Sequence, residues 1–201
     1  DADQAAPGAL ADQRAELAVW DNRDGRLLQV WQGEIGYTER VAVSDDGSIA
    51  VSADSRGGLT AWQVGKSQPV GHIVHADKIA YVQCEFSPEG VLHTISWDGV
   101  IRRHAWPSLE VERTWMAGRQ RSVTTGGLDF THQVAFTHNY FGPVLAIDLA
   151  TDSIVFRRPR HRDAYQAMAL SPDGTKVALL AAEDSLEVWD FKQARSLYRR
   201  S

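Results

Sequence analysis

One pattern constrains this chain more than any other: a short apolar segment recurs five times at intervals of 42 or 43 residues. Each copy is short and rich in aromatic and branched residues, which predicts a β-strand rather than a helix. A period this regular indicates that one supersecondary unit is copied along the chain. The copies are LAVWD (17–21), LTAWQ (59–63), IRRHA (101–105), VLAID (144–148) and LEVWD (186–190).

Tight turns recur in phase with these segments. Three intervals carry a Ser-x-x-Gly turn, in the forms SDDG (44–47), SPEG (87–90) and SPDG (171–174). Proline fixes φ and glycine tolerates a positive φ, so this order of residues favours a tight turn between two short strands. The remaining interval has THQ (131–133) at the corresponding place, and we expect its turn to have degenerated.

The chain resembles the WD40-repeat family over about residues 16–199. The Trp-Asp pairs at 20–21 and 189–190 match the signature of that family, and the turn at 171–174 matches its Ser-Pro-Asp-Gly turn. The resemblance implies an all-β fold, namely a β-propeller of four-stranded antiparallel blades with little or no helix. It says less about function, because one fold serves many functions.

The repeat arithmetic divides the chain into about four complete blades and a partial N-terminal blade. Residues 1–15 are expected to be a linker or a degraded strand of a preceding blade. Because an isolated meander leaves both faces apolar, blades bury them by stacking, so AMAL (167–170) should be covered on both faces. The expected boundaries are 16–32 for the partial blade and then about 33–74, 75–115, 116–157 and 158–201.

The two ends of this array do not complete each other. The first segment supplies only a third and a fourth strand, while the last blade is complete, and members of the WD40 family typically have about seven blades. We therefore expect a larger ring, completed by roughly two to three missing upstream blades or, alternatively, by a second chain. Size-exclusion chromatography with light scattering separates these cases.

Composition narrows the class of partner. The formal net charge is −5, from 21 basic and 26 acidic residues, so no nucleic-acid partner is expected. Cys84 is the single cysteine, which excludes an internal disulfide, and it is expected to be a small buried residue. No apolar run approaches the ~18 residues that span a bilayer. We expect a soluble protein, with the cytoplasm slightly favoured over the periplasm or secretion.

The sequence carries no catalytic signature that we can identify. It lacks a Gly-x-Ser-x-Gly elbow and a glycine-rich phosphate loop, and its seven histidines form no compact ligand set. The paired carboxylates Asp45–Asp46 and Glu183–Asp184 lie in predicted turns, where they should cap local backbone. We expect no enzyme activity, no cofactor and no metal site.

Several recurring residues are expected to be structural. In the WD40 family a loop His, a strand hydroxyl, a turn Asp and the strand Trp form a hydrogen-bonded tetrad. The resemblance places His75, Thr94, Asp98 and His104 at these positions in one blade, and Asp98 could hold His75 by a charge-assisted bond. The structural repeat positions are Trp20, Trp62, His75, Asp98, His104, His161 and Trp189.

Partner contacts are expected on the loops into the first strand and between the second and third strands, as in the family. Trp97 is either an exposed anchor or a residue packed on the next blade. The basic cluster RRPRHR (157–162) is either a solvated loop or a site for an acidic partner. The candidate partner-binding residues are Tyr37, Trp97, Thr124, Arg162 and Asp163.

These observations predict a non-catalytic scaffold for protein or peptide partners. The first alternative is an accessory or sensor propeller domain of a larger multidomain enzyme whose catalytic part lies upstream. A further alternative is a propeller enzyme with its site in the central channel. The identity of the residues before Asp1 would distinguish the first two hypotheses.

Overall fold

The computed structural model describes residues 15–33, 38–116, 123–139, 142–159, 165–181 and 185–200. Every regular element in these ranges is a β-strand, so the predicted all-β class is confirmed. No helix in the described part of the chain is long and apolar enough to span a membrane. The predicted linker or degraded strand at residues 1–15 lies outside the described residues except for Ala15, which begins the first strand.

The strands form five antiparallel sheets, each of which follows the chain order as a meander. Sheet I pairs β1 (Ala15–Trp20) with β2 (Leu27–Gly33). Sheet II contains β3 (Thr38–Val43), β4 (Ile49–Asp54), β5 (Gly58–Gln63) and β6 (Gly71–Val74). Sheet III contains β7 (Tyr81–Phe86), β8 (Leu92–Ser96), β9 (Val100–His104) and β10 (Val111–Met116). Sheet IV contains β11 (Val123–Asp129), β12 (Val134–Asn139), β13 (Val144–Asp148) and β14 (Ser153–Arg158). Sheet V contains β15 (Tyr165–Leu170), β16 (Lys176–Ala181), β17 (Leu186–Asp190) and β18 (Arg195–Arg200).

The turn between β3 and β4 shows how the sequence sets each hairpin. The Ser44 hydroxyl donates to Asp46 at 2.6 Å, and the same carboxylate accepts the Ser48 backbone N–H at 3.0 Å. These bonds hold the pKa of Asp46 at about 2, with the Ser44 hydroxyl as the largest cause. Gly47 has a φ of 69°, which a residue with a side chain adopts only at a cost. The predicted capping role of Asp46 is therefore confirmed.

The turn between β11 and β12 keeps its shape although its sequence has degenerated. Gln133 adopts a φ of 53° at the place where the other turns have glycine. The Asp129 carboxylate accepts the His132 backbone N–H at 3.0 Å and lies 2.8 Å from its Nδ1. The Asp129 side chain therefore holds this turn, as the Asp46 side chain holds the turn between β3 and β4.

The apolar core lies between the sheets rather than within any one of them. Val51 and Leu59 of sheet II share a buried cluster with Tyr81 and Phe86 of sheet III. Equivalent clusters join sheets III and IV and sheets IV and V. Burial of this kind is the main favourable term in folding, so each sheet depends on its neighbour for stability.

Tryptophan side chains also join neighbouring sheets by hydrogen bonds. Trp31 donates its indole N–H to the Lys66 carbonyl at 2.8 Å, and Trp115 donates to the Leu149 carbonyl at 2.8 Å. The Trp31 ring lies 5.6 Å from the ring of Trp62, between centroids. Each bond ties the last strand of one sheet to the turn between the last two strands of the next sheet.

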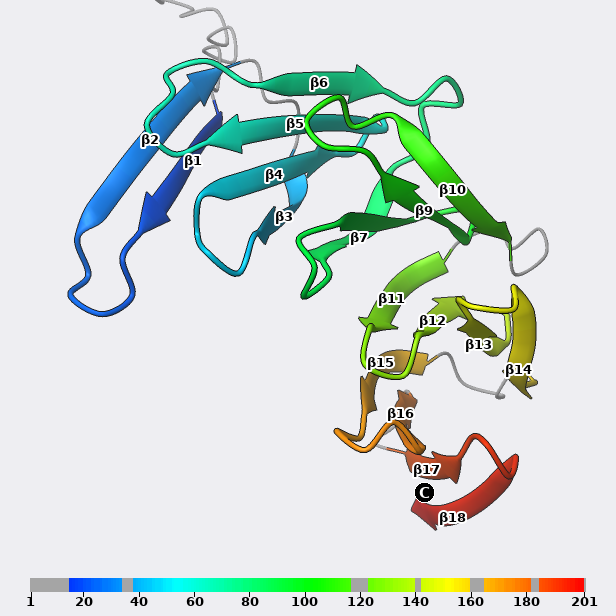
Figure 1. Cartoon of the computed structure of the whole chain (residues 1–201). Helices are drawn as coiled ribbons and strands as arrows, with labels where there is room; N and C mark the ends of the chain where they lie inside the picture. Colours follow the sequence, from blue (N-terminus) through cyan, green and yellow to red (C-terminus); the bar gives the residue numbers. More distant parts are fainter. Residues whose placement is uncertain are drawn as a thin grey trace, which may run out of the picture.

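The sheets follow one another along an open arc, with β1 and β2 at one end and β15 to β18 at the other (Figure 1). Both ends of the arc expose apolar side chains. Trp20 of sheet I is 59% exposed, whereas Trp62 at the same register position of sheet II is 2% exposed. Among the described residues, each terminal sheet of this array therefore has one face without a neighbouring sheet (Figure 1).

The far face of sheet V shows the same effect. Leu180 and Val188 are half-buried there, whereas their register equivalents in sheet II, Ala53 and Ala61, are fully buried. The prediction that AMAL is covered on both faces is wrong for this structure. Ala167 is exposed because it points away from sheet IV, at the end of the arc.

Candidate interaction surfaces

Antiparallel meanders place their connections at two opposite ends of each sheet. One end carries the turns between second and third strands and the connections between sheets, and we call it the Trp97 face. The other end carries the turns between first and second strands and between third and fourth strands, and we call it the opposite face. Trp97 and Thr124, two of the predicted partner-binding residues, belong to the Trp97 face.

Trp97 lies in the turn between β8 and β9, with 47% of its surface exposed. Its backbone is fixed on both sides, because its N–H donates to the Ala80 carbonyl and its carbonyl accepts the Val123 N–H, each at 2.8 Å. Ala80 precedes the first strand of its own sheet, and Val123 begins the first strand of the next. The indole is thus presented to solvent from a backbone that two sheets hold in place.

Thr124 is brought close to Trp97 by the bond through Val123. It is exposed, and its hydroxyl lies 3.3 Å from Nδ1 of the buried His138. Tyr37, Arg162 and Asp163 lie outside the described residues. The structure therefore brings two of the five predicted partner-binding residues together and does not test the other three.

The tetrad implied by the WD40 resemblance is present only in part. Thr94 Oγ1 lies 2.9 Å from Nε2 of His104, so the strand hydroxyl and the residue at the tryptophan position are joined. The expected contact between Asp98 and His75 is not found among the hydrogen bonds of the described residues. Asp98 instead accepts the Ser96 hydroxyl at 2.5 Å and the Val100 backbone N–H at 3.3 Å, which are closer in sequence.

His75 and the other repeat positions take different partners. His75 Nδ1 lies 3.7 Å from Asp77 Oδ2, and burial, followed by the nearby Arg102, lowers its pKa. Trp62 donates its indole N–H to the Ser52 hydroxyl at 3.1 Å, as a strand tryptophan with a strand hydroxyl should. His161 and the turn pair Glu183–Asp184 lie outside the described residues.

The indole of Trp189 is bonded to a carboxylate, where that of Trp62 is bonded to a strand hydroxyl. Its indole N–H donates to Glu187 Oε2 at 2.8 Å, and Arg158 of sheet IV donates to the same oxygen at 3.1 Å. The Tyr165 hydroxyl also donates to it, at 3.3 Å. Burial raises the pKa of Glu187, but the bonds from Arg158 and Trp189 outweigh it, so the pKa lies below its usual value.

This arrangement bears on the basic cluster at residues 157–162. Arg158 is paired with the buried Glu187, and its guanidinium carbon lies 4.9 Å from the centroid of the Trp189 ring. It therefore ties sheets IV and V together and is not free for an acidic partner. Arg157 is exposed, and residues 160–162 lie outside the described residues.

The chemistry available to the described residues is limited. They contain no group of three or more His, Cys, Asp or Glu side chains that could hold a metal ion. Cys84 is buried as expected, and burial raises the pKa of its thiol to about 12. A thiol with this pKa is almost entirely protonated at neutral pH and is a poor nucleophile.

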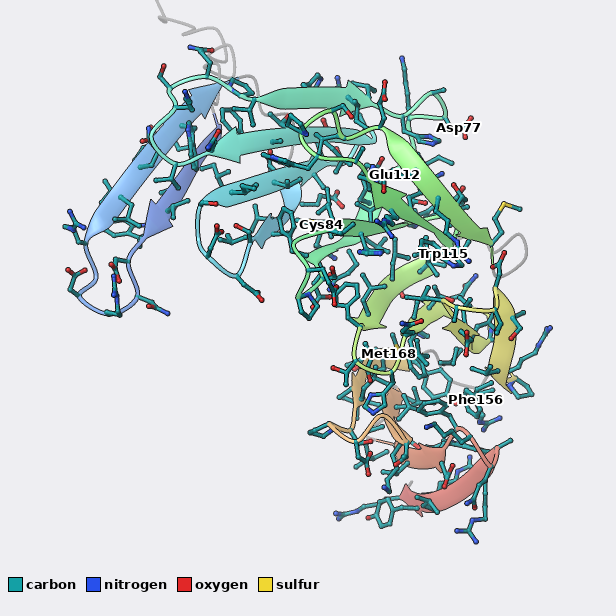
Figure 2. The ribbon with its side chains drawn as sticks, viewed as in Figure 1. Asp77, Cys84, Glu112, Trp115, Phe156 and Met168 are labelled. Atoms are coloured by element: carbon teal, nitrogen blue, oxygen red, sulfur yellow. The ribbon has the colours of Figure 1, made fainter. Side chains whose placement is uncertain are left out.

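Sequence reasoning missed a cleft on the opposite face, between sheets III and IV. The sequence repeat contains a departure at this place that could have indicated the cleft. His93 occupies a position where the other sheets have the apolar residues Val51, Phe136 and Ala178. Trp115 lies at this seam (Figure 2). The described residues that line the cleft are Ser87, Glu89, Val91, His93, Arg103, Arg113, Trp115, Phe130, Gln133, Leu149 and Ala150.

Together these features define an all-β protein whose four-stranded antiparallel sheets stack along an arc in the manner of β-propeller blades. The chain is similar to periodic tryptophan protein 2 of Saccharomyces cerevisiae, with 24% identity over 189 residues. That similarity covers 91% of this chain and 19% of the yeast protein, so the chain spans about a fifth of its relative's length. No protein-family model matches the chain.

Proposed function

We propose that this chain is a non-catalytic scaffold built on WD40-type repeats, which binds a protein or peptide partner through its Trp97 face. The observation that carries this proposal is the half-exposed indole of Trp97 on a backbone bonded to two sheets. Aromatic side chains held in this way bury a large area on binding and lose little conformational entropy. Thr124 lies beside it and offers a hydroxyl at the same surface.

The similarity to the yeast protein supports the repeat architecture rather than any particular partner. The name of that protein refers to tryptophans that recur periodically. In this chain Trp20, Trp62 and Trp189 recur at equivalent register positions of sheets I, II and V. What the yeast protein binds is a property of a chain about five times longer. The partner of this chain is therefore defined only by the surface that would contact it.

The two exposed faces at the ends of the arc support completion of a larger ring. In sheet II the equivalent residues, Ala53 and Ala61, are buried against sheet III, whereas Leu180 and Val188 are only half-buried. Trp20 lacks the cover that Trp62 receives from Trp31. Further blades, from the same chain or from a second one, would bury both faces.

The test is to replace Trp97 with alanine and to measure affinity for a partner purified from the native source. Truncation of an aromatic anchor costs about 2 kcal/mol or more, so binding should weaken about thirtyfold. Trp106→Ala is the matched control, since Trp106 is also an exposed tryptophan but lies between β9 and β10 on the opposite face, and it should leave the affinity unchanged. A lower melting temperature for Trp97→Ala with unchanged affinity would show that Trp97 is only a packing residue.

A further inference from the structure

The cleft between sheets III and IV has an accessible volume of about 400 Å³. It is bounded by the first turn of sheet III and by the first and last turns of sheet IV, so it opens on the face opposite to Trp97. A volume of this size accommodates a few side chains of a peptide. Binding there would be independent of binding at the Trp97 face.

Aromatic rings form one wall of this cleft. The His93 ring lies between those of Trp115 and Phe130, at centroid distances of 6.0 Å and 5.0 Å. Trp115 is 3% exposed and is held by its bond to the Leu149 carbonyl. The His93 ring is tilted by 33° from Trp115 and by 53° from Phe130, so the three rings form a fixed apolar corner rather than a flat surface.

The tryptophan pair that joins sheets I and II has no counterpart between sheets III and IV. Trp31 occupies in sheet I the position that Trp115 occupies in sheet III, and Trp62 of the next sheet covers it. The residue of sheet IV that corresponds to Trp62 is Ile147, which is smaller and lies within the same apolar cluster as Trp115. The ring beside Trp115 at the cleft is therefore His93 of its own sheet rather than a second tryptophan.

His93 provides a hydrogen-bond acceptor among these rings. Its Nδ1 lies 3.1 Å from the Val91 carbonyl, so Nδ1 carries the proton and Nε2 is the acceptor of a neutral ring. Burial is the main cause that lowers the pKa of His93, which favours this neutral form. None of the described residues donates a hydrogen bond to Nε2. A backbone N–H of a bound peptide can satisfy it.

Two arginines line the cleft beside this wall. The guanidinium carbon of Arg113 lies 4.7 Å from the centroid of the Trp115 ring, and no described carboxylate lies within ion-pair distance of it. Arg103 donates to Glu112 at 2.9 Å in a pair of which both side chains are nearly half exposed. The lining contains one acidic residue, Glu89, and Arg103 is already paired with Glu112, so Arg113 is the cation of the lining that has no described carboxylate within ion-pair distance.

We propose that this cleft binds a short acidic peptide segment that carries one large apolar side chain. The apolar side chain would lie against Phe130, because Trp115 is only 3% exposed and Arg113 lies over its ring, and flanking carboxylates would pair with Arg113 and Arg103. Guanidinium groups bind carboxylates through two parallel hydrogen bonds, which sets both the charge and the spacing of the ligand. The combination of an apolar wall, a neutral acceptor and two cations matches a peptide better than a simple anion.

The probe is a panel of fluorescein-labelled peptides in which Phe, Trp or Leu is flanked on each side by two glutamates. Matched peptides replace the central residue with Ala or all glutamates with Gln. Binding is measured by fluorescence anisotropy to the wild-type chain and to Arg103→Ala/Arg113→Ala. The control variant is Arg23→Ala/Arg26→Ala, which removes the same charge from two exposed arginines that pair with Asp21 and Asp24 in sheet I.

The acidic peptides should bind, and each guanidinium removed should weaken binding about tenfold, or about a hundredfold for the double variant. The Arg23→Ala/Arg26→Ala control should bind like the wild type, and both sets of matched peptides should bind more weakly. In a nitrogen-labelled sample, the Trp115 indole resonance should shift on binding while that of Trp97 stays in place.

Three outcomes would overturn this proposal. One is that no acidic peptide of the panel binds, and another is that both double variants bind the peptide equally well. The third is a shift of the Trp97 indole without a shift of Trp115, which would assign the peptide to the Trp97 face. Because Trp97→Ala leaves the cleft intact, failure of the proposed scaffold surface and failure of the cleft are distinguishable.

Discussion

Two buried histidines make the stability of this protein sensitive to mild acid. His104 is 2% exposed and His138 is 1% exposed, and burial, as the largest cause, lowers the pKa of each to about 4. Arg102, His93 and His75 add to the effect at His104, while the bond to the Leu109 carbonyl opposes it. In the unfolded chain both groups have a pKa near 6.5.

The direction in which stability changes with pH follows from proton uptake by the unfolded chain. Between about pH 6.5 and pH 4 the unfolded chain binds protons at these histidines and the folded chain does not, so acid favours unfolding. Their stabilising contribution is complete above the unfolded pKa and is lost as the pH falls toward the folded pKa. At pH 5 each histidine loses about 1.36 kcal/mol for each of 1.5 pH units, or about 2 kcal/mol, and the pair loses about 4 kcal/mol.

A loss of this size is a large part of the roughly 5–15 kcal/mol that stabilises a typical domain. Urea unfolding, followed by tryptophan fluorescence at a series of pH values between about 7.5 and 5, measures it directly. His138→Phe is the decisive variant, because apolar residues (Ala53 and Ile95) occupy this register position in sheets II and III. The substitution removes the Nε2 atom of His138, which has no hydrogen-bond partner among the described residues. The free energy of unfolding at pH 7.5 should therefore not fall.

His138→Phe should therefore remove about 2 kcal/mol of the loss between pH 7.5 and pH 5. His75 and His93 also have lowered pKa values, so they act in the same direction and do not mask the effect. A free energy of unfolding that stays flat between these pH values would refute the reasoning. So would an undiminished loss in the His138→Phe variant.

Two further predictions concern buried groups. Glu187→Gln should lower the free energy of unfolding by about 3 kcal/mol, since it leaves the largely buried Arg158 without its counter-charge. Glu112→Gln, which breaks the exposed pair with Arg103, should cost less than about 1 kcal/mol, and equal costs in urea unfolding would contradict the assignment. Cys84 should not react with iodoacetamide in the native protein and should react once in urea, because its buried thiol has a pKa of about 12; alkylation of the native chain, followed by mass spectrometry, would contradict its burial.

The strands were predictable because the signals that define them are local. A strand was expected at residues 186–191, and β17 occupies Leu186–Asp190, one residue shorter. The turn chemistry was equally local, since Asp46 caps the backbone within two residues of its own position. Local signals also explain one wrong prediction, because Asp98 bonds to Ser96 and Val100 in its own turn rather than to the distant His75.

The contacts between sheets could not be predicted in the same way. Arg158 and Glu187 are 29 residues apart, and their pairing requires sheets IV and V to be stacked in one register. The cleft has the same origin, since its wall combines Trp115 of sheet III with Phe130 of sheet IV. A repeat pattern predicts that neighbours stack, but the side chains that meet at a seam depend on the twist and offset of the sheets.

The positions where the repeat departs from its own pattern are therefore the most informative ones. At the third-strand tryptophan position, Trp62 bonds to a serine, His104 to a threonine and Trp189 to a glutamate. Each of these three residues keeps a hydrogen bond within its sheet, although the partner side chain differs in charge from one sheet to the next. Ile147 keeps no such bond, because its side chain is a hydrocarbon, and it lies instead in the buried apolar cluster that joins sheets III and IV. Loss of the repeated residue thus costs one sheet its polar bond, and apolar packing against the neighbouring sheet takes its place.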